Sequence, residues 1–214
     1  MCVGFLVLIL SIAVSPVQNG RKPGSDSEYL SWDSKRVNSI AKRMRVTGDV
    51  GGSFDFRITS TDKAYNYKLR ATLFTPEMIR ASARHWQLRE RLTDDQTRAL
   101  VIEAESVVGT VVMVEIDPRE GSGVIPSGWI SVLKAKDSNV EVKGTVTPSL
   151  RALKALSGTA QRDYAYDVFW VVFPSVDENG RTVLPDWTSE VELVVTIYNK
   201  RGKVTWKIPR GDRD

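Results

Sequence analysis

The residue types that most often carry enzyme chemistry are scarce in this sequence. It contains one cysteine, Cys2, and one histidine, His85. Nucleophilic catalysis by a serine or cysteine needs an imidazole to accept the proton, so His85 is the single candidate base. It falls in a predicted helix, where the spacing places it on one face with Met78, Leu88 and Leu92. That environment is typical of a packed side chain, and the sequence predicts no catalytic residue.

A metal site would have to be built from oxygen ligands, as calcium and magnesium sites are. Asp177, Glu178, Asn179 and Gly180 are consecutive, and Asp186 follows shortly after them. An Asn-Gly pair between two strands is, however, typical of a tight turn. We therefore predict a turn here, with no metal and no cofactor.

Paired carboxylates could also hydrolyse glycosidic bonds. The densest group of acids is Glu103, Glu105, Glu115 and Asp117. Glu103 and Glu105 point in different directions on a predicted helix, and we expect Glu115 and Asp117 on the solvated side of a strand. A carboxylate-dependent extracytoplasmic hydrolase, with no histidine or cysteine chemistry, therefore stays as the alternative function.

The segment 117–128 is a long connection that contains three glycines. It has no Gly-Lys-Ser/Thr sequence and no following helix, so it is not a phosphate-binding loop. Long loops on rigid sheets often carry function, which makes this segment the best candidate for a binding site by position alone.

Basic residues form the last group of candidate functional residues. The candidate binding residues are Lys42, Arg43 and Arg45 in one cluster, and Arg80, Arg84 and Arg91 along one side of a helix. Either group could contact anionic lipid headgroups or an acidic polysaccharide. A solvated helix face is the alternative, because several acids lie near the second group. The net charge of +4 is too small for a dedicated nucleic-acid binder, so no specific nucleic acid is expected.

The N-terminal segment predicts export from the cytoplasm. Residues 3–14 are almost purely apolar but too few to span a bilayer, and Ala13 and Ser15 supply small residues at the end of this run. We interpret 1–17 as a signal peptide or short anchor, with a buried strand as the alternative, and 18–28 as a flexible polar linker. No Asn-x-Ser/Thr site is present, which favours a bacterial periplasmic, envelope-tethered or secreted location.

Residues 29–214 are predicted to form one β-rich domain, because apolar and polar residues alternate along much of it. Segments 54–58 and 65–73 should form a hairpin. Further strands are expected at 110–116, 129–136, 140–146, 164–173, 191–198 and 203–208. Residues 137–139 and 199–202 should form hairpin turns. The segment 164–173, apolar on both faces except at Asp167, predicts a central strand.

Two helices should interrupt the strands, near 76–91 and 94–106. Thr75-Pro76-Glu77 is a favourable helix start, and Thr93 with Gln96 forms a capping-box sequence. A short helix at 148–158 and a helix that passes into a strand near Arg45 are also expected. The fold class predicted is mainly β (α+β): an antiparallel β-sandwich of about eight strands with an inserted helical pair.

The expected sandwich positions include most of the aromatic residues of the strands. They are Phe54, Phe56, Tyr67, Phe169, Trp170 and Trp206, with Phe169 and Trp170 on opposite layers. With catalytic chemistry scarce, the sequence predicts a noncatalytic extracytoplasmic binding or assembly module of the cell envelope. The expected partner is an envelope protein, an anionic lipid or a polysaccharide.

Overall fold

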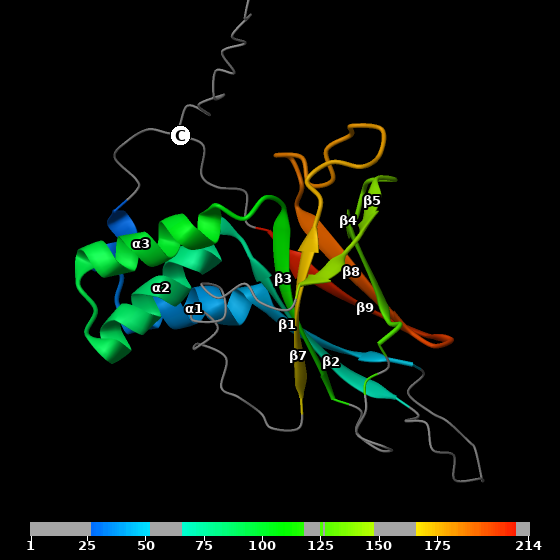
Figure 1. Cartoon of the computed structure of the whole chain (residues 1–214), viewed down its shortest axis with the longest axis horizontal. Helices are drawn as coiled ribbons and strands as arrows, with labels where there is room; N and C mark the ends of the chain where they lie inside the picture. Colours follow the sequence, from blue (N-terminus) through cyan, green and yellow to red (C-terminus); the bar gives the residue numbers. More distant parts are fainter. Residues whose placement is uncertain (1–26, 52–65, 118–124, 126, 148–165, 209–214) are drawn as a thin grey trace, which may run out of the picture.

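The computed structural model describes residues 27–51, 66–117, 125, 127–147 and 166–208. Within these ranges, nine strands form two antiparallel sheets, and three α-helices accompany them (Figure 1). The predicted mainly β class, an antiparallel sandwich with an inserted helical pair, is confirmed.

The two sheets have separate strand orders. The first sheet has the order β1-β2-β3-β7-β6, with β1 (Arg45–Val50), β2 (Tyr67–Phe74), β3 (Thr110–Asp117), β7 (Asp167–Phe173) and β6 (Thr145–Thr147). The second has the order β5-β4-β8-β9, with β5 (Glu141–Lys143), β4 (Ile130–Ala135), β8 (Glu190–Ile197) and β9 (Lys200–Lys207). Their inner faces enclose the main core.

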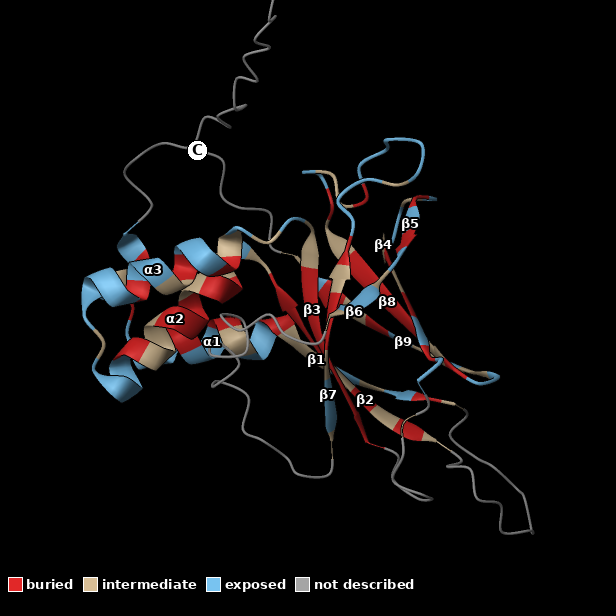
Figure 2. Ribbon diagram, viewed as in Figure 1, coloured by how far each residue is buried: buried red, intermediate tan, exposed pale blue. Residues whose placement is uncertain are grey.

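The helices cover the outer face of the first sheet (Figure 1). They are a short 3-10 helix, Glu28–Ser31, followed by α1 (Ser34–Met44), α2 (Pro76–Glu90) and α3 (Asp94–Glu105). In α1 the buried residues Val37, Ile40 and Met44 recur every three or four positions, which is the stripe of a helix packed on one face. In Figure 2 buried positions run along β3 and along the sides of the helices that face it. The expected passage from helix to strand near Arg45 is confirmed.

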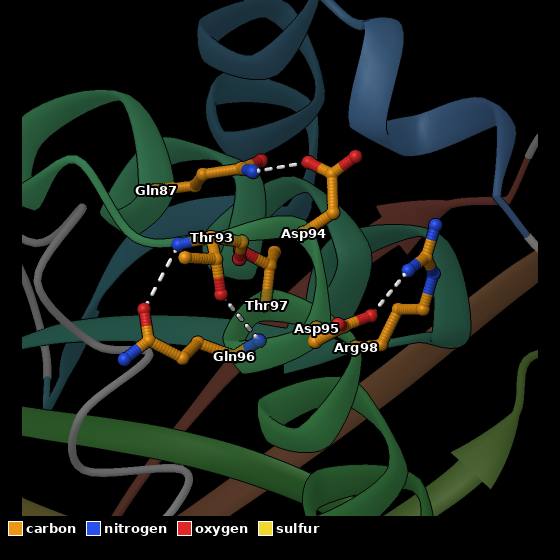
Figure 3. A network of polar contacts seen from close by, with 7 residues as sticks. All are labelled: Gln87, Thr93, Asp94, Asp95, Gln96, Thr97 and Arg98. Carbon is orange, nitrogen blue, oxygen red and sulfur yellow. Dashed lines mark hydrogen bonds and ion pairs between the residues drawn. The ribbon is translucent and has the colours of Figure 1, made fainter.

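The start of α3 has the predicted capping box. The Thr93 hydroxyl accepts a hydrogen bond from the Gln96 backbone nitrogen at 3.2 Å, and the Gln96 side chain accepts one from the Thr93 nitrogen at 2.9 Å (Figure 3). Gln87 of α2 donates to the Asp94 carboxylate at 2.7 Å, which fixes the two helices relative to each other.

Thr93→Ala should lower the free energy of unfolding by about 1 kcal/mol, because it removes the acceptor for an otherwise unpaired helix N–H. Urea denaturation of both proteins measures the difference. Ser39→Ala, on the exposed side of α1, is the control and should cost nothing, because alanine favours the helix. A loss at Thr93 no greater than at Ser39 would contradict this role of the cap.

The inner core confirms several of the predicted aromatic positions. Tyr67 is 1% exposed and Trp206 is fully buried. Phe169 packs with Trp129, their ring centroids 5.1 Å apart, while Trp170 packs with Phe74 under the helices at 5.3 Å. Phe169 and Trp170 therefore lie on opposite layers, as expected. Phe54 and Phe56 fall outside the described residues.

The sandwich is closed along both edges. Gly144 lies between β5 of the second sheet and β6 of the first, and a Cβ there would come 2.3 Å from a Val171 methyl group. On the other side β9 approaches β1, where a Cβ on Gly202 would lie 2.2 Å from the Asp49 carbonyl oxygen. The Gly51 nitrogen donates to the Arg201 carbonyl at 3.3 Å. Glycine is required at both positions, because a Cβ would collide with the Val171 and Phe173 side chains at 144 and with the backbone of β1 at 202.

Several local predictions are wrong. Among the described residues, β2 pairs with β1 on one edge and with β3 on the other, and these are not the partners expected for 65–73. The last turn is Tyr198–Asn199 and not 199–202, since Tyr198 takes a φ of 55° and the ladder already resumes at Lys200.

The strand expected over 140–146 divides at Gly144. In β7 Val168 is 48% exposed, so this strand is covered on both faces only in its C-terminal half. Segments 54–58 and 148–158 lie outside the described residues.

Candidate functional site

The outer face of the first sheet changes from apolar to polar along its strands. One cross-strand row contains Arg45, Thr72, Met113 and Trp170 in register, and the helices cover its apolar end. The next row contains Arg70 opposite Glu115. Side chains in such rows lie roughly 5 Å apart, so the two rows form one continuous surface beside α1.

A pocket of about 270 Å³ lies between α1 and this surface. Its polar wall consists of Asn38 and Lys42 of α1, Arg45 of β1 and Thr72 of β2. Its apolar wall consists of Ala41, Phe74, Met78 and Met113. The pocket lining therefore contains two cations and no carboxylate. Among other pockets of the described residues, one has Glu141, Asp177 and Glu178 in its lining and another has Asp33 and Glu77.

Glu115 anchors the polar end of this surface. Its carboxylate is 3% exposed, and its oxygens accept from the Arg45 guanidinium at 3.1 and 3.3 Å and from Arg70 at 3.4 Å. The Arg70 guanidinium also lies over the Tyr166 ring, 4.4 Å from its centroid. Our expectation of a solvated Glu115 is wrong, because two arginines and an aromatic ring enclose this part of the strand.

Polar groups in the pocket wall are left without partners. Thr72 is 3% exposed, and its hydroxyl forms no hydrogen bond. The Arg45 Nε atom is buried and likewise unpaired, although the same guanidinium contacts Glu115 through its terminal nitrogen. Lys42 is exposed at the rim and forms no ion pair with the described residues. An unsatisfied buried donor costs roughly 1 to 3 kcal/mol, so these groups would gain from a ligand that accepts hydrogen bonds.

The other predicted basic residues contact neighbouring groups. Arg43 pairs with Glu77 at the start of α2. Arg80 pairs with Glu105 of α3 at 3.2 Å. Arg84 donates to the Trp32 carbonyl at 2.9 Å and to the Gln87 side chain at 2.7 Å. These side chains hold the helices together.

Arg91 lies beyond the end of α2, in a left-handed conformation with a φ of 56°, and is exposed. Of the six predicted binding residues, the structure brings Lys42 and Arg45 together in the wall of one pocket.

His85 is half-buried on α2, as a packed histidine would be. Burial lowers the pKa of its imidazole below the ordinary value, and the positive charge of Arg89 lowers it further. The neutral form is therefore favoured near neutral pH. His85 does not line the pocket beside α1.

The acidic segment at 177–180 forms the predicted turn. The Asp177 carboxylate accepts from the backbone nitrogens of Asn179 and Arg181 and from the Arg181 side chain at 2.7 to 2.9 Å, and Gly180 takes a φ of 73°. Among the described residues, no three acids, histidines or cysteines are grouped as metal ligands. Most of the long loop 117–128 lies outside the described residues.

The pocket itself is not apparent from the sequence pattern. Thr72 occupies a polar position in the alternation of β2, a pattern that indicates a solvated side chain, whereas α1 covers it. One signal was available: β3 is apolar on both faces from Val111 to Val114, which indicates that both faces are covered at that level of the sheet. In the β2–β3 register Thr72 lies opposite Met113. An element that covers Met113 on this face therefore also covers Thr72.

Comparison with protein-family models, with curated proteins and with solved structures found no match for this chain. No helix in the described part of the chain is both long and apolar enough to cross a bilayer.

Proposed function

We propose that this protein is a noncatalytic binding module that acts outside the cytoplasm and recognises an anionic component of the cell envelope through Lys42 and Arg45. The observation that carries the proposal is the charge of the pocket beside α1, whose lining has two cations and no acid. Lys42 stands at its rim without an ion-pair partner among the described residues. A cation that is not neutralised locally attracts anions at longer range.

The proposed location rests on the sequence. The apolar run at 3–14 and the polar segment at 18–28 are typical of an export signal and a tether. A tethered domain works next to a membrane, and anionic lipid headgroups are the negatively charged groups it meets there. An anionic lipid surface is therefore the partner we propose, with acidic polysaccharide as the comparison.

The two cations lie at the C-terminal end of α1, which makes the test more sensitive. The C-terminal end of a helix carries a partial negative charge that repels anions. Lys42 and Arg45 lie at that end, so their side chains must supply all of the attraction. Reversing one of these charges should therefore have a large effect.

Lys42→Glu should weaken binding to phosphatidylglycerol vesicles by about 30-fold, since each basic residue near an anionic surface contributes roughly 1 kcal/mol and the change removes one charge and adds its opposite. Vesicle sedimentation at 10 and 150 mM salt measures it, and wild-type binding should fall at the higher salt. Phosphatidylcholine vesicles and alginate are the comparison ligands.

Lys143→Glu is the matched control, because Lys143 is an exposed lysine on β5 of the second sheet, away from α1. Arg91→Glu tests the α2 group separately. All variants keep the same N-terminal run, so insertion of that run cancels in the comparison. Equal binding by Lys42→Glu and Lys143→Glu would reject the proposed contact, and preferential binding to alginate would reassign the partner.

A further inference from the structure

The pocket beside α1 has two chemically different ends. Arg45 and Thr72 are direct partners in the β1–β2 ladder, so their side chains leave the same face side by side. Phe74 lies two residues further along β2, and Met78 follows in the first turn of α2. The pocket therefore runs from a polar end, with Lys42 at its rim, to an apolar end over a distance of roughly 7 Å along the strand.

The polar end offers hydrogen-bond donors that the protein leaves unused. They are the Thr72 hydroxyl and the Arg45 Nε–H, both buried and without partners. A carboxylate has two oxygens and accepts from two neighbouring donors at once. The Lys42 ammonium adds a positive charge at the same end. A terminal nitrogen of the Arg45 guanidinium already donates to Glu115, so Arg45 would contact a ligand through its Nε–H.

The apolar end fits an alkyl chain. Phe74, Met78 and Met113 are 5%, 2% and 2% exposed, and together they present an aromatic ring and two flexible thioether side chains. Methionine adapts to chains of irregular shape. At about 30 Å³ for each water-sized group, a volume of about 270 Å³ holds roughly nine groups. That is the size of a medium-chain carboxylate.

We propose that this pocket binds a medium-chain fatty carboxylate, with the carboxylate on Thr72, Arg45 and Lys42 and the alkyl chain against Phe74, Met78 and Met113. The inference rests on the proposed function and deepens it, because the anionic component then has an acyl chain as well as a charge. A free fatty acid and an anionic lipid share this chemistry, because each joins a negatively charged headgroup to an acyl chain. Soluble probes and vesicles distinguish the two sources.

Isothermal titration of the full chain with butanoate, hexanoate, octanoate and octanol is the test. Each methylene that enters the pocket should tighten binding about fourfold, so octanoate binds far more tightly than butanoate. Octanol, which lacks the carboxylate, should bind at least about tenfold more weakly than octanoate. Equal affinity for butanoate and octanoate, or for octanol and octanoate, would overturn the proposal.

Two variants locate the site. Thr72→Val removes an unpaired hydroxyl at nearly constant volume, so it should fold normally and weaken octanoate binding by about tenfold. Ala41→Leu, at the α1 wall, fills the pocket with a good helix-forming residue and should abolish octanoate binding. Ser39→Leu, on the exposed side of α1, is its control. Octanoate affinity unchanged in both Thr72→Val and Ala41→Leu would place the ligand elsewhere.

The same variants separate this inference from the proposed function. If octanoate fails to bind while vesicle binding still depends on Lys42, the acyl pocket is wrong and the anionic recognition stands. If octanoate binds as expected while Lys42→Glu leaves vesicle binding unchanged, the source is a free fatty acid and the membrane contact is wrong. Loss of vesicle binding in Ala41→Leu would show that the pocket takes the headgroup and part of the acyl chain of an anionic lipid.

Discussion

Trp206→Ala should lower the free energy of unfolding by about 3 to 5 kcal/mol. Trp206 is fully buried in the core between the two sheets, and its indole N–H donates to the Met44 carbonyl at 2.8 Å. Met44 is the last residue of α1, where carbonyl groups have no partner within the helix. The substitution therefore opens a large cavity and also leaves a buried carbonyl unpaired.

Trp187→Ala is the matched control, because Trp187 is 58% exposed and the same substitution there leaves no cavity. Chemical denaturation with equal m-values for the three proteins makes the comparison valid. Trp206→Phe keeps most of the volume and isolates the hydrogen bond, with an expected loss of roughly 1 to 3 kcal/mol. A loss below about 1 kcal/mol for Trp206→Ala would mean that this residue faces outward.

The Trp206 contact also bears on the pocket. It fixes the end of α1 next to Arg45, and Lys42 lies two residues before Met44. Trp206→Phe should consequently weaken octanoate binding even though it is on β9 and does not line the pocket. This hydrogen bond thus links the core of the sandwich to the helix that forms one wall of the candidate binding site.

Glu115→Ala should lower the free energy of unfolding by about 3 kcal/mol, the low end of the range for breaking a buried ion pair. The Glu115 side chain is 3% exposed and holds two guanidinium groups that would otherwise repel each other. The Arg45 and Arg70 side chains keep 26% and 19% exposure, so water can partly compensate them after the change. That access to water is why the loss stays below the largest values known for such pairs.

Glu90→Ala provides the control, because the Arg89–Glu90 pair has 47% and 45% exposed side chains and should contribute less than about 1 kcal/mol. Guanidinium chloride would screen both pairs, so urea is the denaturant to use. Glu115→Gln keeps the size of the side chain and tests the charge alone. If Glu115→Ala costs no more than Glu90→Ala, the contact is a surface pair and the enclosed polar row does not exist.

Local sequence determined the ends of the elements. Thr75 and Thr93 each accept a hydrogen bond from the first turn of a helix, and these caps were readable from residue type and spacing. Alternation of apolar and polar residues located most of the strands, and a change of periodicity marked the passage from α1 to β1. These features depend on contacts between residues a few positions apart, so the sequence contains the information directly.

Tertiary structure decided which faces are covered. Alternation places Thr72 and Glu115 on the polar face of their strands, but it does not say that α1 lies over Thr72 or that two arginines enclose Glu115. The division of 140–146 at Gly144 likewise follows from the crossing of the chain between two sheets. The pocket joins α1, β1, β2, α2 and β3. Such a site exists only once distant segments pack together, because periodicity reports which residues share a face and not what lies against it.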